Sequence, residues 1–464
     1  MRTVGSHQVE PARAPVSLCP ICLVTPAMTA VQPIERARIA GEHTKTALVL
    51  AGGGLTGVAY EIGALRAIEE MLVSRDAPQF DIIVGTSAGA FVGSLLAKGL
   101  TPGELMQALD GSAPLLTRYQ PNHLFSLNTR EFARRSLQLP RTARSAVAHY
   151  LRNRGDMNLF DLLWSLIEVL PSGLYDNSTL AKFVQETLQV RGLSDDFEDV
   201  NCELYVIATD LDTGERVVLG QGPWCDVPLS RAIAASSAVP LLYRPVRIGD
   251  SELVDGGLRG TASLDLAIEA GAKLIVCINP LVPVDNRTKA NVPLLGHDGR
   301  FLSEKGFQAV GAQILRIVMQ SGLDYHVKQL RRRHPDVDII LIEPRRDDYK
   351  MFFHNIMRYS ARLTIAQHGF ESVTLDLADQ YPMLKAVLAR HGLAITRRFV
   401  IEELEAMRQS GNDLEVVRTV MERGHVPEPA PPVQTSITEN LKTTLGELEE
   451  VINRLEASSW SLAA

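Results

Sequence analysis

The sequence predicts an α/β fold, a three-layer sandwich with a mostly parallel central sheet, a helical cap insertion and a helical C-terminal extension. Two observations carry this prediction. The apolar runs TALVLA (46–51) and IIVG (82–85) are typical of buried strands, and each is followed by a glycine-rich turn and a segment with helical spacing. A strand, a turn and a helix repeated in this order indicate parallel strands joined by helices that cover both faces of the sheet.

The composition indicates a large globular protein and excludes several classes. Of the 464 residues, 45% are hydrophobic and 22% are charged, which excludes a wholly disordered or collagen-like chain. The net charge of −7 gives no reason to expect nucleic acid as a partner. No run of 18 apolar residues occurs, so we expect no membrane-spanning helix. Five scattered cysteines fit a reducing compartment, so we expect a cytoplasmic location.

We expect four segments along the chain. Residues 1–45 have no helical or strand period and are predicted to be a disordered leader. Residues 46–290 are predicted to form the main α/β domain, with a helical insert at 111–175. Residues 291–425 are predicted to be a mainly helical extension that adds one strand, and 426–464 a proline-rich linker and a short amphipathic helix.

The elements before the insert follow from apolar spacing and turn residues. Apolar residues recur at helical spacing over 58–72, which predicts a helix after the first strand. The small-residue segment 90–98 predicts a second helix. Thr101 and Glu104 are spaced as in a capping box, with Pro102 at the first helical position, and they predict the start of a third helix.

After the insert, hairpins and helices alternate with buried strands. The turn at 212–214 predicts a hairpin over 203–220, and Gly249-Asp250 predicts a second, shorter one. The other predicted elements are helices at 178–188, 230–238 and within 347–425, buried strands at 272–280 and 338–344, and between these strands a long helix with Phe307, Val310, Ile314 and Ile317 on one stripe.

A serine stands on a predicted strand-to-helix turn in the motif G-x-S-x-G, spelled GTSAG from Gly85 to Gly89. Such a turn exposes the serine hydroxyl at a helix N-terminus, where the partial positive charge favours a developing anion. The N–H of Ala88, directly after Ser87, is a natural oxyanion donor. The motif by itself also fits a glycine-rich helix start with a capping serine.

The first glycine-rich turn, GGGLTG from Gly52 to Gly57, exposes several N–H groups in a row and predicts an anion-binding nest. Beside the serine turn of the neighbouring strand, Gly53 and Gly54 would supply the remaining oxyanion donors. The same letters fit the G-x-G-x-x-G of dinucleotide sites. That fingerprint expects an acidic residue at the end of the second strand, whereas Asp81 precedes that strand, so its position argues against NAD.

A nucleophilic serine needs a base, and the residues offer two kinds of candidate. Asp255 stands in VDGG, where Gly256 and Gly257 leave its carboxylate approachable. The other candidate is a late histidine, in the Ser–Asp–His order of α/β-hydrolases. The histidines after Asp255 are His297, His326, His334, His354, His368 and His391.

The motifs GGGLTG, GTSAG and VDGG, in this order, together with LPSGLYDNSTLAKF (170–183), resemble the patatin-like phospholipase family. The resemblance implies a catalytic domain over 46–290, with Ser87 as nucleophile, Asp255 as proton acceptor without histidine, and Gly52 to Gly57 as the oxyanion loop. The family loop often carries Lys or Arg before its last glycine, where this chain has Thr56. The implied function is hydrolysis of fatty-acyl esters of phospholipids or related lipids, without a cofactor.

Two alternatives to this function stay open. One is a catalytically silent protein of the same fold that binds a lipid or a partner, and the other is a Ser–Asp–His esterase. We expect no metal site, because the sequence has no H-x-E-x-x-H and no paired C-x-x-C. The lone Cys19-x-x-Cys22 is weak support for zinc or redox chemistry.

The insert suggests a surface for lipid, since residues 118–154 carry eight arginines and one acidic residue, Glu131, among leucines and phenylalanines. Basic, partly apolar segments bind anionic lipid at about 1 kcal/mol per basic residue, which predicts peripheral contact with a membrane. A solvated helix face beside an acidic patch of the same protein explains the charge equally well. A two-heptad apolar pattern at 437–456 fits either oligomerisation or docking on the same chain.

Overall fold

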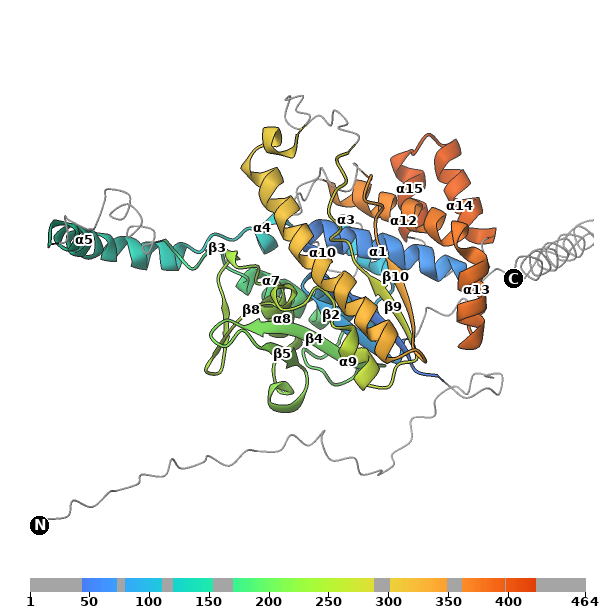
Figure 1. Ribbon diagram of the computed structural model, residues 1–464, viewed down its shortest axis with the longest axis horizontal. Coiled ribbons are helices and arrows are strands. Elements are labelled where there is room, and N and C mark those ends of the chain that lie inside the picture. The colour runs from blue at the N-terminus through green and yellow to red at the C-terminus, as the bar shows by residue number, and fades with distance from the viewer. Residues whose placement is uncertain are drawn as a thin grey trace, which may run out of the picture. The chain divides into compact units, whose positions relative to one another are not determined.

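The structure is a computed structural model, and it describes residues 44–72, 80–110, 120–152, 170–287, 301–348, 361–396 and 398–422. The described residues fall within one compact unit that ends at Glu422 (Figure 1). Almost all of the predicted leader, and the whole predicted linker and C-terminal amphipathic helix, lie outside the described residues.

In the described part of the chain, eight strands form a mixed central sheet with the order β10-β9-β1-β2-β4-β8-β7, and β5 pairs with β4 outside this path. The five strands from β10 to β4 run parallel, and β5, β7 and β8 run antiparallel to their neighbours. The parallel strands are β1 (Thr46–Leu50), β2 (Ile82–Thr86), β4 (Glu203–Asp210), β9 (Leu274–Ile278) and β10 (Asp338–Ile342). The antiparallel strands are β5 (Arg216–Leu219), β7 (Val246–Ile248) and β8 (Ser251–Asp255).

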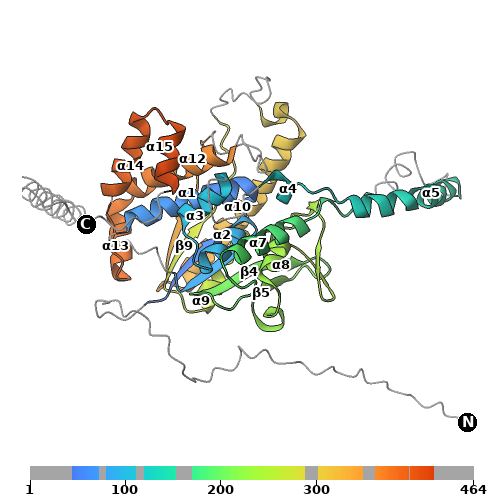
Figure 2. The same ribbon diagram turned by 180° about the vertical axis from the view of Figure 1, so that it is seen from behind.

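Helices cover both faces of this sheet, because successive side chains of a strand point to opposite faces. In β1, Leu48 and Leu50 belong to one hydrophobic core, and Ala47 and Val49 belong to the other. Helices α9 and α10 pack against the second core (Figure 1). The other helices that line a core pack against the first, and two of them, α1 and α3, are labelled in Figure 2. The predicted three-layer α/β fold with a mostly parallel sheet is confirmed. The helices of the main part are α1 (Gly54–Met71), α2 (Ala88–Ala97), α3 (Pro102–Asp110), α7 (Ser178–Val190), α8 (Leu229–Ser236), α9 (Leu264–Glu269), α10 (Phe307–Arg333), α12 (Arg362–Asp379), α13 (Tyr381–Arg390), α14 (Arg398–Gln409) and α15 (Leu414–Glu422).

Local sequence signals place most of these elements. The Thr101 hydroxyl accepts the Glu104 N–H at 3.2 Å and the Glu104 carboxylate accepts the Thr101 N–H at 2.9 Å, so the predicted capping box is confirmed. Both predicted hairpins are present as β4–β5 and β7–β8. One helix differs from its prediction: α1 begins at Gly54 rather than at 58, so the glycine motif is divided between a loop and the first helical turn.

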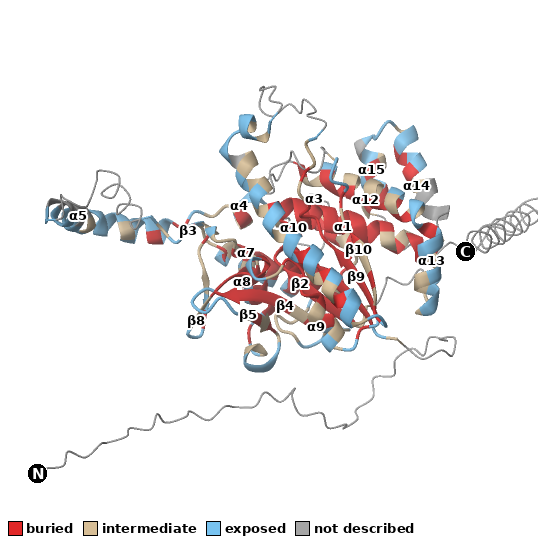
Figure 3. Ribbon diagram, in the orientation of Figure 1, coloured by how far each residue is buried: buried red, intermediate tan, exposed pale blue. Residues whose placement is uncertain are grey.

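The described part of the insert contains α4 (Pro121–Leu124), the long helix α5 (Thr129–Arg152) and β3 (Gly173–Tyr175), which pairs with β6 (Leu241–Tyr243). Glu131 anchors the first turn of α5, because it accepts hydrogen bonds from the Ser172 N–H at 3.1 Å and from Asn128 at 2.7 Å. Burial raises the pKa of Glu131, but hydrogen bonds from Ser172, Asn128 and Arg135 lower it to about 2. Most described side chains of α5 beyond this anchor are exposed (Figure 3).

None of the helices in the described ranges has the length and apolar character that crossing a membrane requires.

Candidate active site

Ser87 stands on a sharp turn between β2 and α2, as the G-x-S-x-G motif predicts. Its φ of 55° and ψ of −113° are rare for a residue with a side chain, and it is 4% exposed. The turn is tight enough to exclude larger residues at both flanking glycines: a Cβ on Gly85 would overlap the Gly89 carbonyl, and one on Gly89 would overlap the Leu50 carbonyl. Only glycine at these two positions allows α2 to start so close to the sheet.

Strand β4 brings Asp255 level with Ser87. Thr86 pairs with Ile207 in the parallel register of β2 and β4, so the next residue, Ser87, is level with Ala208. Ala208 in turn pairs with Asp255 in the antiparallel register of β4 and β8. Neighbouring strands lie about 4.8 Å apart, and the single methyl group of Ala208 leaves room for the two longer side chains to meet.

The Ser87 hydroxyl is near enough to the Asp255 carboxyl to lower the pKa of that carboxyl by hydrogen bonding. Asp255 is 6% exposed, and its Oδ1 also accepts the N–H of Gly257 at 2.8 Å. Burial raises the pKa of Asp255 to about 6, and the hydrogen bonds from Ser87 and Gly257 oppose this rise. The carboxyl is therefore a stronger base than an ordinary aspartate and is still ionised at neutral pH.

The glycine loop lies against this pair. A Cβ on Gly52 would be 3.4 Å from the Ser87 Cβ, and Gly54 has a φ of 60°. Among the described residues, we find no acceptor for the N–H groups of Gly53, Gly54 and Ala88, as is usual at helix starts.

Two glycines of the motifs have their N–H groups engaged in the fold. Gly57 donates to the Gly53 carbonyl at 3.0 Å, and Gly89 donates to the Ala51 carbonyl at 3.2 Å. Gly57 is also tightly packed, since a Cβ there would be 3.2 Å from Pro280. Gly57 and Gly89 allow close packing, and their N–H groups already have acceptors in the fold. Gly256, next to Asp255, also packs closely, in its case on Ile207.

Three of the late histidines that the structure describes have partners elsewhere, and the fourth, His334, directly follows α10. His326 lies 4.0 Å from Asp265, His368 contacts Asp348, and His391 contacts Asp338 at 2.8 Å. His297 and His354 lie outside the described residues. Within the described ranges, no histidine contact to Ser87 or Asp255 is found.

A mostly apolar pocket opens beside Ser87. Its walls come from α1, α2, α4, α7 and β6, so the insert contributes directly to it. Besides Ser87, Ala88 and Gly54, the pocket is lined by Leu55, Val58, Phe91, Leu124, Asn177, Leu180, Ser237, Val239 and Tyr243. Such a lining suits an aliphatic chain better than a charged group.

Helix α8 holds the serine turn in place, a role that the sequence did not reveal. The Ser87 N–H donates to the fully buried Ser236 hydroxyl at 2.8 Å, and that hydroxyl donates to the Ile207 carbonyl at 2.5 Å. The Ser237 hydroxyl donates to the Ser87 carbonyl at 3.4 Å. The only signal in the sequence was an Ala/Ser-rich helix, which does not distinguish these hydroxyls from ordinary buried ones.

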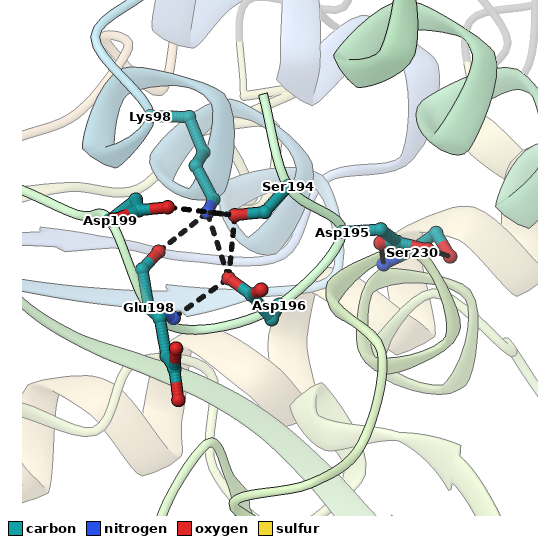
Figure 4. Close-up of polar contacts among 7 residues, drawn as sticks. All are labelled: Lys98, Ser194, Asp195, Asp196, Glu198, Asp199 and Ser230. Carbon is teal, nitrogen blue, oxygen red and sulfur yellow. Dashed lines mark hydrogen bonds and ion pairs between the residues drawn. The ribbon is translucent and has the colours of Figure 1, made fainter. Parts of the chain in front are cut away.

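The opposite ends of α2 and α8 are also tied together (Figure 4). Lys98, at the end of α2, donates to Ser194 at 3.0 Å and to the Glu198 carbonyl at 2.6 Å. Asp195 of the same loop accepts the N–H and the hydroxyl of Ser230, both at 2.7 Å, at the start of α8. The two helices are therefore joined at both ends, with Ser87 at one of them.

No group of three His, Cys, Asp or Glu side chains within the described ranges is arranged to hold a metal ion. Cys19 and Cys22 lie outside those ranges, and the described cysteines Cys202, Cys225 and Cys277 are free thiols.

Comparison with known proteins finds several relatives. Residues 48–268 match the sequence model of the family described as patatin-like phospholipase. The uncharacterized protein YqhO of Bacillus subtilis (strain 168) is 25% identical over 312 residues, which cover 61% of this chain and 91% of YqhO. The probable lipid hydrolase 463L of Invertebrate iridescent virus 6 is 22% identical over 228 residues, which cover 48% of this chain and 63% of the viral protein. The crystal structure of VipD from Legionella pneumophila aligns with 93% of this chain and 92% of VipD, at 15% identity and a TM-score of 0.25.

Proposed function

Since residues 48–268 match the model of the patatin-like phospholipase family, we propose that the protein is a serine hydrolase that cleaves fatty-acyl esters of phospholipids or related lipids. The observation that carries the proposal is the register of β2, β4 and β8, which brings Ser87 level with Ala208 and Ala208 beside the buried Asp255. A hydroxyl is a poor nucleophile unless a base accepts its proton during attack. Here the proposed base, Asp255, is close enough to the Ser87 hydroxyl to sense it, and burial raises the pKa of Asp255 to about 6.

The reaction would proceed in two steps through an acyl-enzyme. Asp255 takes the Ser87 proton while Oγ attacks the ester carbonyl carbon, and the carbonyl oxygen becomes an oxyanion. The N–H groups of Gly53, Gly54 and Ala88 are the proposed oxyanion donors, because they have no other acceptor among the described residues. The alcohol leaves with the proton from Asp255. Water then attacks the acyl group, Asp255 accepts its proton, and the fatty acid departs as Ser87 regains a proton.

The substrate class follows from the surroundings of Ser87. The apolar pocket beside it would hold a fatty-acyl chain, and its wall residue Leu124 belongs to α4, directly before the basic helix α5. Exposed arginines on α5, such as Arg134 and Arg141, would bring the pocket to an anionic membrane surface. We therefore propose a cytoplasmic protein that contacts a membrane peripherally. Self-association through 437–456 remains a prediction on residues that the structure does not describe.

A lipid-panel hydrolysis assay with wild type and Ser87→Ala tests the proposal. Ser87→Ala and Asp255→Asn should each reduce ester hydrolysis by at least 1,000-fold, and Ser87→Ala should also abolish labelling by a fluorophosphonate probe. The matched control is Ser372→Ala, whose half-buried hydroxyl on α12 donates to the Gly369 carbonyl. Retained turnover in Ser87→Ala would falsify the dyad.

The same assay separates the two alternatives. A wild-type protein that binds lipid but neither turns over nor reacts with the probe would be a silent binding protein. A loss of activity on replacing His297 or His354, with Asp255→Asn still active, would favour a Ser–Asp–His esterase. With the dyad as proposed, single His→Ala changes after Asp255 should retain activity.

A further inference from the structure

Helix α10 exposes large apolar side chains that no described part of the chain covers. Phe307 is 95% exposed, Val318 64% and Tyr325 67%, and Ile314 and Ile317 are also exposed. The sequence predicts the stripe of Phe307, Ile314 and Ile317, and in the structure these three side chains face solvent. Single exposed apolar residues are ordinary, but a cluster of this size on one helix marks a contact surface.

The cluster continues into a group of positive charges on the same face. Positions 307, 314, 318, 325 and 332 are separated by seven, four, seven and seven residues, which keeps them on one side of a helix. The row spans about 38 Å at 1.5 Å per residue. Its last part is cationic, because Arg332 lies in the row and Lys328 one turn before it, and both are exposed with no carboxylate partner among the described residues.

The opposite side of α10 packs on the loops of the candidate active site. The Met319 methyl group would lie 3.8 Å from a Cβ on Gly52 and 2.8 Å from one on Gly257, so it sits between the glycine loop and the loop after Asp255. Gln320 is 2% exposed and accepts a hydrogen bond from Asn279 at 2.7 Å, next to the same loops. A partner bound to the outer face of α10 would therefore be one helix diameter, about 10 Å, from the dyad.

We propose that the outer face of α10, from Phe307 to Arg332, docks on a phospholipid bilayer that contains anionic lipids. The proposal rests on the proposed function as a lipid hydrolase. A surface helix that exposes a row of apolar side chains, with cations at its C-terminal end, lies in the plane of a membrane interface with the apolar side chains among the acyl chains and the cations near the phosphates. Docking in this way brings the dyad close to its substrate without a membrane-spanning element.

Charge favours lipid over a second copy of the chain as the occupant. Helix α10 contains a single acidic residue, Asp324, and this residue already contacts Arg346 at 3.4 Å. A second copy of the helix would thus bring more cations and no spare carboxylate to the interface. An anionic bilayer supplies the negative charge that Lys328 and Arg332 lack.

The test is vesicle co-sedimentation of the full chain in the Ser87→Ala background, so that binding is measured without hydrolysis. The vesicles are phosphatidylcholine with or without phosphatidylglycerol, at low and high salt. Ile314→Ser/Val318→Ser should weaken binding at least tenfold, and Lys328→Gln/Arg332→Gln should remove the preference for phosphatidylglycerol. The control Leu375→Ser/Met383→Ser changes exposed apolar residues on α12 and α13 and should bind within twofold of the parent.

One further variant and two further measurements make each outcome decisive. Arg134→Gln/Arg141→Gln changes exposed arginines of α5: if only this variant loses binding, the α10 proposal is wrong and the α5 surface stands. If sedimentation velocity shows a dimer that Ile314→Ser/Val318→Ser converts to a monomer with unchanged vesicle binding, the outer face of α10 is an interface between two copies of the chain.

With Ser87 restored, the α10 variants should hydrolyse a short soluble ester at the parental rate and vesicle lipid at least tenfold more slowly. A protein that binds vesicles through α10 but hydrolyses no ester would contradict the proposed function and leave the docking surface intact.

Discussion

At the residue scale, the serine turn carries strain that neighbouring groups must stabilise. A non-glycine residue with the φ of Ser87 costs about 1–3 kcal/mol and persists only when its surroundings fix it. The surroundings here are Ser236, which accepts the Ser87 N–H, and Ser237, which donates to the Ser87 carbonyl. Ser236 contacts Ser87, the proposed nucleophile, only through the Ser87 backbone, so we expect it to act as a positioning residue.

Replacing Ser236 by alanine should slow the chemistry more than it changes substrate binding. The Ser87 N–H would lose its buried acceptor, a loss of about 1–3 kcal/mol, so kcat should fall about tenfold or more while KM stays within twofold. The fluorophosphonate labelling rate should fall by the same factor. The control is Ser94→Ala on α2: its hydroxyl is equally buried but has no partner among the described residues, so labelling should be unchanged. Equal labelling rates for both variants would remove the positioning role.

The raised pKa of Asp255 predicts opposite pH effects on activity and stability. The base acts as a carboxylate, so kcat/KM should fall about tenfold per pH unit below about 6. A folded pKa raised from 3.8 to about 6 contributes stability that is present below pH 3.8 and lost as the pH rises through 6. Relative to wild type, Asp255→Asn should therefore gain about 3 kcal/mol in the free energy of unfolding at pH 8, and almost nothing at pH 4.

Urea denaturation at the two pH values measures this difference, since wild type and Asp255→Asn differ by one titrating group. An Asp255→Asn variant that is less stable than wild type at pH 8 would contradict the prediction that the ionised, buried Asp255 carboxylate destabilises the folded state.

At the element scale, α2 and α8 act as a pair because both of their ends are connected. Lys98→Met keeps the length of the side chain but removes the ammonium group that joins α2 to Ser194 and the Glu198 carbonyl. The free energy of unfolding should fall by about 1–3 kcal/mol, because the ammonium of Lys98, whose side chain is 0% exposed, makes hydrogen bonds that join the two helices. The control is Lys182→Met, where the side chain is 73% exposed and pairs with Glu186 at 3.6 Å, and a change within about 0.5 kcal/mol is expected.

Thermal unfolding followed by circular dichroism distinguishes the two lysines. If Lys98→Met were as stable as Lys182→Met, the contacts drawn in Figure 4 would not hold the helix pair.

The elements of the sheet could be predicted because their signals are local. Apolar runs, glycine turns and the capping box of Thr101 and Glu104 depend only on neighbouring residues, and these elements are confirmed. The face that a helix buries depends on the rest of the fold, so the stripe on α10 could be seen in the sequence but not its exposure. In the same way, the sequence placed Ser87 and Asp255 on the right turns, while the support from Ser236 and the use of the Gly57 N–H depend on contacts between distant segments.

At the scale of the whole molecule, helices from the two ends of the described chain share one core. A Cβ on Gly63 of α1 would overlap the Ala366 carbonyl of α12, and one on Gly369 of α12 would be 2.9 Å from the Tyr60 carbonyl. These two glycines allow the two helix backbones to touch. Residues after 361 are thus part of the support of α1, which begins in the glycine loop.

The same substitution at two helical glycines should therefore have opposite effects. Gly63→Ala should lower the free energy of unfolding by at least about 2 kcal/mol, because the added methyl group forces α1 and α12 apart. Gly311→Ala on α10 should raise it by up to about 1 kcal/mol, because its Cβ meets open space and alanine favours the helix. Differential scanning calorimetry measures both, and a single transition that shifts as one unit in Gly63→Ala is expected. A stabilising Gly63→Ala would contradict the close contact of the two helices.

The registers around β4 also determine where the chain tolerates changes in length. Ser87 and Asp255, the proposed nucleophile and base, are 168 positions apart, yet their alignment depends only on the pairing of Thr86 with Ile207 and of Ala208 with Asp255. Adding or deleting a residue within β4 would turn every following side chain to the other face and separate the two groups. Residues can be added or removed in the cap between α5 and β3, or in the turn after β5, without altering either register. Natural variants and engineered fusions should accordingly differ in length at those two places and keep β4 intact.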